Sequence, residues 1–262
     1  MILAQKNIFE FYTGLDDRQW DTTENKYNAI VVLPRYTVPS IQLFVDVATA
    51  ATLDLCNSEG EVLDSIDSMV VEAETGYVRL KYISDQYDGD ADEGYFCLKI
   101  TTSEEVFYSD VFEWRTDVTL SGLIKITASS SNFSLGIDKE YLYDTTNFTF
   151  ECYLKVFDYP GLSTETEELA RDANGVLFPY YTGTAISESW IINGNKHIYR
   201  FLSILRLLQQ NGVVTILWEG TTRTANDIMD EISVDHGYYD LVDIELKIKA
   251  SGDVVTVINK TN

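Results

Sequence analysis

Residues 181–187 read YTGTAIS, residues 197–210 read HIYRFLSILRLLQQ, residues 213–218 read VVTILW and residues 239–249 read YDLVDIELKIK. The first, third and fourth segments are rich in β-branched and aromatic residues, which favours strands. The second carries apolar residues at i, i+3, i+4, i+7 and i+10 from Ile198, which predicts one amphipathic helix near 197–210, ended by Asn211-Gly212. Because a single helix can cover the apolar face of an antiparallel sheet, we expect a β-rich domain with one helix over residues 116–262.

The sequence on either side of these segments extends the same domain. Further strands are predicted at Gly122–Ile126 and Phe148–Val156. Asn193-Gly194-Asn195 is typical of a tight turn, and Asp227–Ile232 indicates a short second helix. The sequence before the strand predicted at 181–187 contains an acidic, Glu-rich segment and a turn at 171–175.

The first half of the chain predicts a β-sandwich of the immunoglobulin or fibronectin kind over residues 25–115. Short strands separated by polar turns favour this class, and Ile41–Val47 alternates with period two over most of its length. Glu105–Phe112 is expected to close the sandwich through a hairpin with Gly94–Ile100. Residues 1–24 are polar and aromatic and predict an arm or edge element, which either reaches a neighbouring subunit or folds back on its own chain.

Composition limits the classes of function. The chain has 262 residues, enough for two domains, and a formal net charge of −23 spread over both halves. Such a charge argues against specific nucleic-acid binding, which needs clustered Lys and Arg. Its simplest interpretation is solubility, and a surface that faces DNA in transit without adhering to it is the alternative.

The three cysteines Cys56, Cys97 and Cys152 have no metal-ligand spacing, and a reducing site of synthesis is expected. The N-terminal residues show no secretory signal, and no apolar run is long enough for a membrane helix. We therefore expect synthesis in a cytoplasm and no membrane partner.

Reaction centres are not evident in the sequence. Asp88, Asp90 and Asp92 match the first calcium-loop positions of an EF-hand, but Glu93 and Lys99 stand where Gly and Glu are required, which favours an acidic hairpin turn. The two histidines, His197 and His236, lie near no nucleophile motif. We assign no catalytic, cofactor-binding or metal-binding residue and no cofactor, and we expect the protein not to be an enzyme.

Aromatic side chains suggest a different class of site. Those considered as sugar-stacking or interface residues are Tyr141, Tyr143, Tyr180, Tyr181, Tyr238, Tyr239 and Trp190. A sugar-stacking face would make a carbohydrate-binding module, but the same residue types are enriched in protein interfaces. Half-buried strand positions explain most of them without a ligand.

The order of turn, hydroxyl-rich strand, helix and closing strand, with Ser187, Trp190 and Trp218 within it, resembles the β-rich domains of tail proteins from Bacteroidetes-infecting phages, crAss-like phages among them. The resemblance covers Ser121–Lys249 best, and Tyr108–Phe112 is similar to the closing strand of small sandwich modules in such phages. It implies a structural subunit of the virion tail, ring-forming or connecting, whose partners are copies of itself and other tail or portal-proximal proteins. The arm 1–24 and loops such as 158–180 are then the expected mating elements.

The main alternative is a carbohydrate-binding, receptor-binding module on a β-sandwich. A tail-associated hydrolase is disfavoured, because the sequence shows no nucleophile or metal set.

Overall fold

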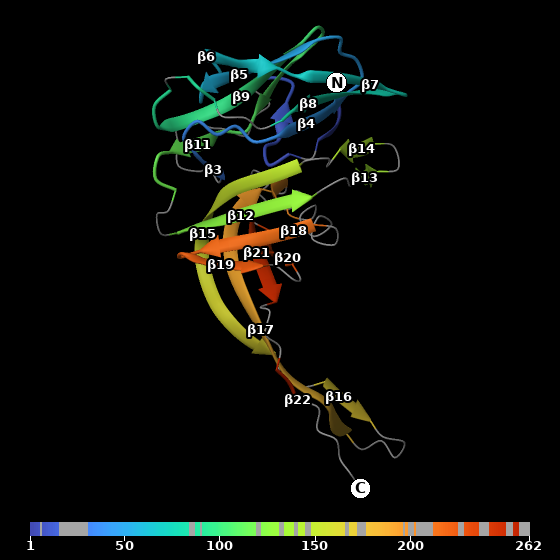
Figure 1. Cartoon of the computed structure of the whole chain (residues 1–262), viewed down its shortest axis with the longest axis vertical. Coiled ribbons are helices and arrows are strands. Elements are labelled where there is room, and N and C mark those ends of the chain that lie inside the picture. The colour runs from blue at the N-terminus through green and yellow to red at the C-terminus, as the bar shows by residue number, and fades with distance from the viewer. Residues whose placement is uncertain are drawn as a thin grey trace.

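The computed structural model describes residues 1–5, 7–15, 31–83, 87–89, 91–118, 122–130, 134–138, 141–144, 148–165, 168–171, 177–195, 197–198, 202, 212–224, 228–235, 241–249 and 254–256. These residues are mainly β, and their strands pair almost entirely in antiparallel fashion, which confirms the predicted class. The chain forms a two-layered N-terminal body, a second sheet region below it and a long hairpin that extends away from both (Figure 1).

Two sheets face each other in the N-terminal body. One has the order β1 (Ile2–Gln5), β4 (Ile41–Val45), β8 (Tyr77–Tyr82) and β7 (Val70–Glu74). The other contains β6 (Val62–Ser68), β5 (Ala51–Asn57), β9 (Gly94–Thr102), β10 (Val106–Ser109), β11 (Phe112–Arg115) and β2 (Phe11–Tyr12). Leu43 and Leu80 of the first sheet share one core with Leu53 and Leu98 of the second, all four fully buried.

The start of the chain belongs to this body. Ile2 pairs with Val45 of β4, and the Asn7 side chain accepts a hydrogen bond from the backbone N–H of Gln42 at 2.7 Å. Phe9 is fully buried, with its ring 5.0 Å from that of Phe112. Of the two arrangements open for the arm, the described residues fold back on their own chain. They also explain why β4 is buried on both faces, where the alternation predicted one buried face.

The predicted hairpin at the end of the sandwich is confirmed, with one difference. β10 and β11 both pair with β9, but two residues of β9 between the paired positions oppose three on the other side, so the strand expected over 105–112 is interrupted. At the interruption, the Ser109 hydroxyl accepts the Leu98 N–H at 2.8 Å in place of a backbone carbonyl.

One strand joins the two halves of the molecule. β3 (Val31–Pro34) pairs in parallel with β11 and antiparallel with β15 (Phe148–Glu165), so the sheet of the body continues into the C-terminal half. The sheet then runs through β12 (Leu123–Ser130), β18 (Gly212–Trp218) and β19 (Thr221–Thr224). Trp114 and Trp190 belong to one continuous apolar core that spans the junction.

The remaining C-terminal strands pack beside β15. β17 (Leu177–Asn195) pairs with β15 and β21 (Leu241–Lys249), and β20 (Ile228–Asp235) follows β21. Three short strands complete the region, β13 (Ser134–Asp138) and β14 (Tyr141–Asp144), which pair with each other, and β16 (Glu168–Arg171). A last strand, β22 (Val254–Thr256), lies against β17. The strands predicted around 122–126, 148–156, 213–218 and 239–249 are confirmed as β12, β15, β18 and β21.

Two local predictions are wrong. The described residues of Asp227–Ile232 lie in β20 and not in a helix, because pairing along β21 outweighs local helical preference. Asn193-Gly194-Asn195 continues β17 opposite Leu241–Asp243 and does not turn.

The predicted helix falls mostly outside the described residues. Within it, His197, Ile198 and Leu202 are helical and buried. The His197 Nε2 atom lies 2.7 Å from the Asn7 carbonyl oxygen, so this segment contacts the first strands of the chain.

Candidate functional site

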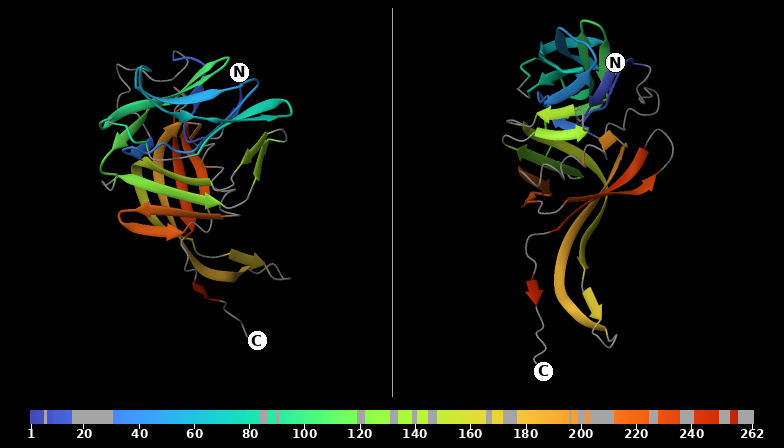
Figure 2. Two further views of the ribbon diagram at one scale, coloured as in Figure 1. Left: turned by 45° about the horizontal axis from the view of Figure 1, so that its top comes forward. Right: turned by 90° about the vertical axis from the view of Figure 1, so that its right-hand side faces the viewer.

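The most distinctive feature of the structure is the hairpin of β15 and β17. β15 pairs with β12 and β3 at its beginning and, from Val156 on, with β17. On the side of Ser187 away from the body, where β21 ends its pairing, the described residues that border β17 are the end of β15, β16 and the three-residue β22. This distal part, residues 162–171, 177–186 and 254–256 among those described, is called the tip below. It projects from the body (Figure 2), and its β17 portion is roughly 30 Å long at the usual rise per residue.

A narrow ribbon of this kind is weakly stable alone. Two strands without a third layer or a packed face are marginal in water, because little apolar surface leaves the solvent. The tip therefore has the geometry of an element that gains stability by lying on another surface.

Two bulges set the direction in which the hairpin leaves the sheet. The register of β15 against β17 shifts between Val156 and Asp158 and again between Asp158 and Gly161. Gly161 has φ of 86°, a conformation that costs least for glycine. Bulges bend a strand and re-aim side chains, and the two strands curve away from the body at this point (Figure 2).

The bulged segment carries an aromatic cluster, called the hairpin base below. Phe157 is 73% exposed and Tyr159 is 39% exposed. The Tyr159 ring lies 6.1 Å from that of Trp190 and 5.5 Å from that of Trp218, centre to centre. Both indoles are buried, and the Glu219-Gly220 turn that follows Trp218 has positive φ at both residues, as in a two-residue hairpin.

A buried carboxylate supports this cluster. Glu188 is 2% exposed, accepts the Tyr159 hydroxyl at 2.6 Å and pairs with the Arg223 guanidinium. The guanidinium carbon also lies 5.9 Å from the Trp190 ring centre. The hydrogen bond to Glu188, with burial and the negative charge as further causes, raises the pKa of Tyr159. Tyr159 thus remains a hydrogen-bond donor at neutral pH, holding the bulge against the sheet.

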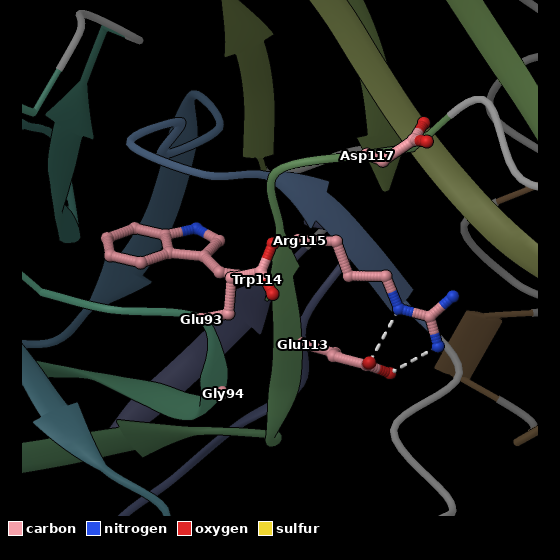
Figure 3. A pocket seen from close by; sticks show the side chains of 6 residues that line it. All are labelled: Glu93, Gly94, Glu113, Trp114, Arg115 and Asp117. Carbon is pink, nitrogen blue, oxygen red and sulfur yellow. Dashed lines mark hydrogen bonds and ion pairs between the residues drawn. The ribbon is translucent and has the colours of Figure 1, made fainter.

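A second site is a pocket of about 400 Å³ beside β9 and β11, lined by Glu93, Gly94, Glu113, Trp114, Arg115 and Asp117 (Figure 3). Arg115 donates two hydrogen bonds to Glu113, at 2.6 and 3.1 Å, and Lys155 of β15 lies 2.9 Å from the same carboxylate. Burial acts to raise the pKa of Glu113, but the hydrogen bonds from Arg115 and Lys155 outweigh it and hold the pKa below its ordinary value. Glu113, at the wall of this pocket, thus links β11 to β15 through its ion pair with Lys155.

Glu113→Gln is expected to lower the free energy of unfolding by about 2 kcal/mol at neutral pH, because hydrogen bonds to charged groups contribute about 1.5–3 kcal/mol. A lowered folded-state pKa means that Glu113 stabilises the fold above its unfolded-state pKa, near 4.5, and that this stabilisation is lost as pH falls below it. Urea unfolding of both proteins from pH 7 to pH 3 should show the difference shrinking. A difference that grows toward pH 3 would contradict the pairing, and Asp92→Asn, at a 94% exposed side chain, is the control.

Among the described residues, those weighed in the sequence as possible ligands or catalytic groups do not come together in one site. Asp92 accepts a hydrogen bond from Arg35 at 3.2 Å, and Asp90 lies outside the described residues. His236 also lies outside them, whereas His197 is buried against Asn7. Among the described side chains, no three His, Cys, Asp or Glu residues are grouped to hold a metal ion. No helix in the described part of the chain is long and apolar enough to cross a membrane.

The aromatic predictions have mixed outcomes. Trp190 is fully buried, so it is not an exposed sugar-stacking residue, because its ring packs against Tyr159 and Trp218. The other tyrosines named for this role lie where side chains are not described. Sequence reasoning missed Phe157 and Tyr159, although the Pro160-Gly161 pair beside them could have marked the irregular strand.

The segment 158–180, predicted as a loop that mates with a neighbouring subunit, is not a loop in its described residues. Its described residues are strands, the end of β15, all of β16 and the start of β17. No family model matches this chain, and no curated protein is significantly similar to it.

Proposed function

We propose that this protein is a structural subunit of a phage tail assembly, a ring-forming or connector component without catalytic activity. The projecting hairpin is the observation that carries the proposal. A marginally stable ribbon with exposed Phe157 at its base is suited to lie along a neighbouring copy of the same chain. Repeated around an axis, such a head-to-tail contact closes a ring.

The resemblance of residues 121–249 to tail proteins of Bacteroidetes-infecting phages supplies the virion context. In this proposal the protein is made in the host cytoplasm and acts in the tail, where it also contacts other tail or portal-proximal proteins. We also propose that the N-terminal body is an immunoglobulin- or fibronectin-like sandwich and that residues near 197–210 form an amphipathic helix. The net charge of −23 suits a particle through which DNA passes, because acidic surfaces do not retain DNA.

Removing the tip is expected to abolish self-assembly. Leu162 and Glu188 face each other in the hairpin, so replacing residues 163–187 by Asn-Gly closes it with a two-residue turn. By mass photometry and negative-stain imaging over a range of concentrations, the full chain should form discrete closed oligomers and the shortened chain should be monomeric. The shortened chain should still unfold cooperatively on heating, because the core residues described all lie outside the segment that is removed.

The matched control is Leu63→Ser on the edge strand β6 of the N-terminal body, where a side chain that is 52% exposed is removed from a different surface. This variant should assemble like the full chain. If the shortened chain forms the same oligomers, the hairpin is not the contact. If the full chain is monomeric at all concentrations, self-assembly of the isolated subunit is contradicted.

A carbohydrate-binding module is the second candidate, and the hairpin base favours it. Tyr159 presents a partly exposed ring, and the indole N–H groups of Trp190 and Trp218 are buried beside it without an acceptor among the described residues. A hydroxyl-bearing ring that stacked on Tyr159 would lie beside the Arg223 guanidinium, which can donate hydrogen bonds. Saturable glycan binding that Tyr159→Ala abolishes would favour this function over assembly.

A further inference from the structure

Cys56 and Cys97 face each other directly on neighbouring antiparallel strands. The register of β5 against β9 places Cys56 opposite Cys97, and both side chains are fully buried. The two thiols interact, and neither is in a disulfide. They lie on the side of the sheet away from the main core, in a small separate cluster with Val111.

The backbone geometry allows a covalent bond between them. Along a strand, the backbone groups of successive residues point alternately to the two neighbouring strands. The Ala51 carbonyl accepts the Met69 N–H on the β6 side, so the backbone N–H and C=O of Cys56, an odd number of residues further on, point to β9. The Leu98 N–H points to Ser109, away from β5, so the backbone N–H and C=O of the adjacent residue Cys97 point to β5. The two cysteines therefore form a hydrogen-bonded pair with Cα atoms about 5.5 Å apart. Disulfides accept Cα separations of about 4.4–6.8 Å.

We propose that Cys56 and Cys97 form a reversible cross-strand disulfide when the protein meets a peroxide. Side chains of a hydrogen-bonded pair are farther apart than those of the alternate pairs, so closing the bond pulls the two strands together. A strained disulfide is more easily reduced than a relaxed one. The bond is thus expected to form outside a reducing cytoplasm and to open again in the presence of thiols.

The reaction balances with one peroxide molecule. The sulfur of one cysteine attacks a peroxide oxygen, which gives a sulfenic acid and the first water after proton transfer. The second thiol then attacks that sulfur, the S–S bond forms, and the hydroxyl leaves with the thiol proton as a second water. The two thiols are oxidised together by two electrons, and the peroxide is reduced.

Access to the pair requires only a local movement. Cys56 lies at the end of β5, next to the turn at 57–61, and its cover on the outer side includes Val111 and the partly buried Tyr95 and Tyr108. Strand ends open at lower free energy than strand centres. The hydrogen bond to Cys97 raises the pKa of the Cys56 thiol, and burial adds to it, so slow oxidation is expected.

The test is treatment of the folded full chain with hydrogen peroxide, followed by quenching, unfolding, alkylation and peptide mapping by mass spectrometry. A peptide linked through Cys56 and Cys97 should appear and disappear again with dithiothreitol. The oxidised protein should also unfold at a Tm roughly 3–6 °C higher, because the link restricts the unfolded chain.

Cys152 is the internal control, since it is fully buried and faces Ile126 across the sheet. The Cys152→Ser variant should form the same linked peptide, and Cys56→Ala should form none. If all three thiols remain alkylatable after oxidation, or if Cys152 enters the linked peptide, the proposal is overturned.

Discussion

Trp114→Ala is expected to lower the free energy of unfolding by about 4 kcal/mol, the largest effect of any single substitution considered. The Trp114 ring is fully buried, 4.9 Å from Phe96 and 5.6 Å from Tyr87 between ring centres. Its indole N–H also donates to the Thr37 carbonyl at 2.9 Å, and that acceptor would lose its partner. Urea unfolding followed by circular dichroism measures the loss, and Tm should fall by roughly 10 °C.

Two further variants test how much of this loss comes from the size of the aromatic side chain and how much from its burial. Trp114→Phe keeps an aromatic ring and should cost about half as much, because the remaining cavity is smaller. Phe157→Ala removes a ring that is 73% exposed and should change stability by less than about 0.5 kcal/mol. A loss of under about 1 kcal/mol for Trp114→Ala would mean that the core between the two halves is not packed as described.

Arg223→Met is expected to lower the free energy of unfolding by about 3 kcal/mol, because it leaves the buried Glu188 carboxylate without its positive partner. The Arg223 side chain is only 25% exposed, so solvent screens the pair weakly. The methionine keeps most of the apolar stem that lies beside Trp190. Chemical unfolding at pH 7 gives the measurement.

The double variant Glu188→Gln with Arg223→Met is the matching control. Removing the buried charge together with its partner should restore at least half of the lost stability, and Tyr159 can still donate to the amide oxygen. If the double variant is less stable than Arg223→Met alone, the charge pair does not govern the hairpin base.

The strands that could be predicted are those with strong local patterns. Val213–Trp218 and Phe148–Val156 are runs of apolar and β-branched residues, and the sheet uses both. The strand predicted at 181–187 lies in β17, but the β15 and β16 side of the distal hairpin could not be predicted, because Pro160-Gly161 and the acidic residues after Leu162 are typical of a loop. Bulges absorb the proline and glycine without ending the strand.

Contacts between distant parts of the sequence account for the rest. Burial of Phe9 depends on Phe112, and the position of His197 depends on Asn7, and neither pairing leaves a trace in local composition. The hairpin base was missed for the same reason. Tyr159, Glu188 and Arg223 have ordinary surroundings in sequence, and only the register of β15, β17 and β19 brings them together.

The continuity of β15 has a mechanical consequence. One strand runs from the tip to the junction, where its residues pair with β12 on one side and with β3 on the other. A pull on the tip is carried along this strand, but the bulges between Val156 and Gly161 bend it, so the force does not run parallel to the part that pairs with β12 and β3. The hydrogen bonds from β15 to β12 and β3 are then loaded partly across their strands, and force applied at the tip reaches the N-terminal body through β3.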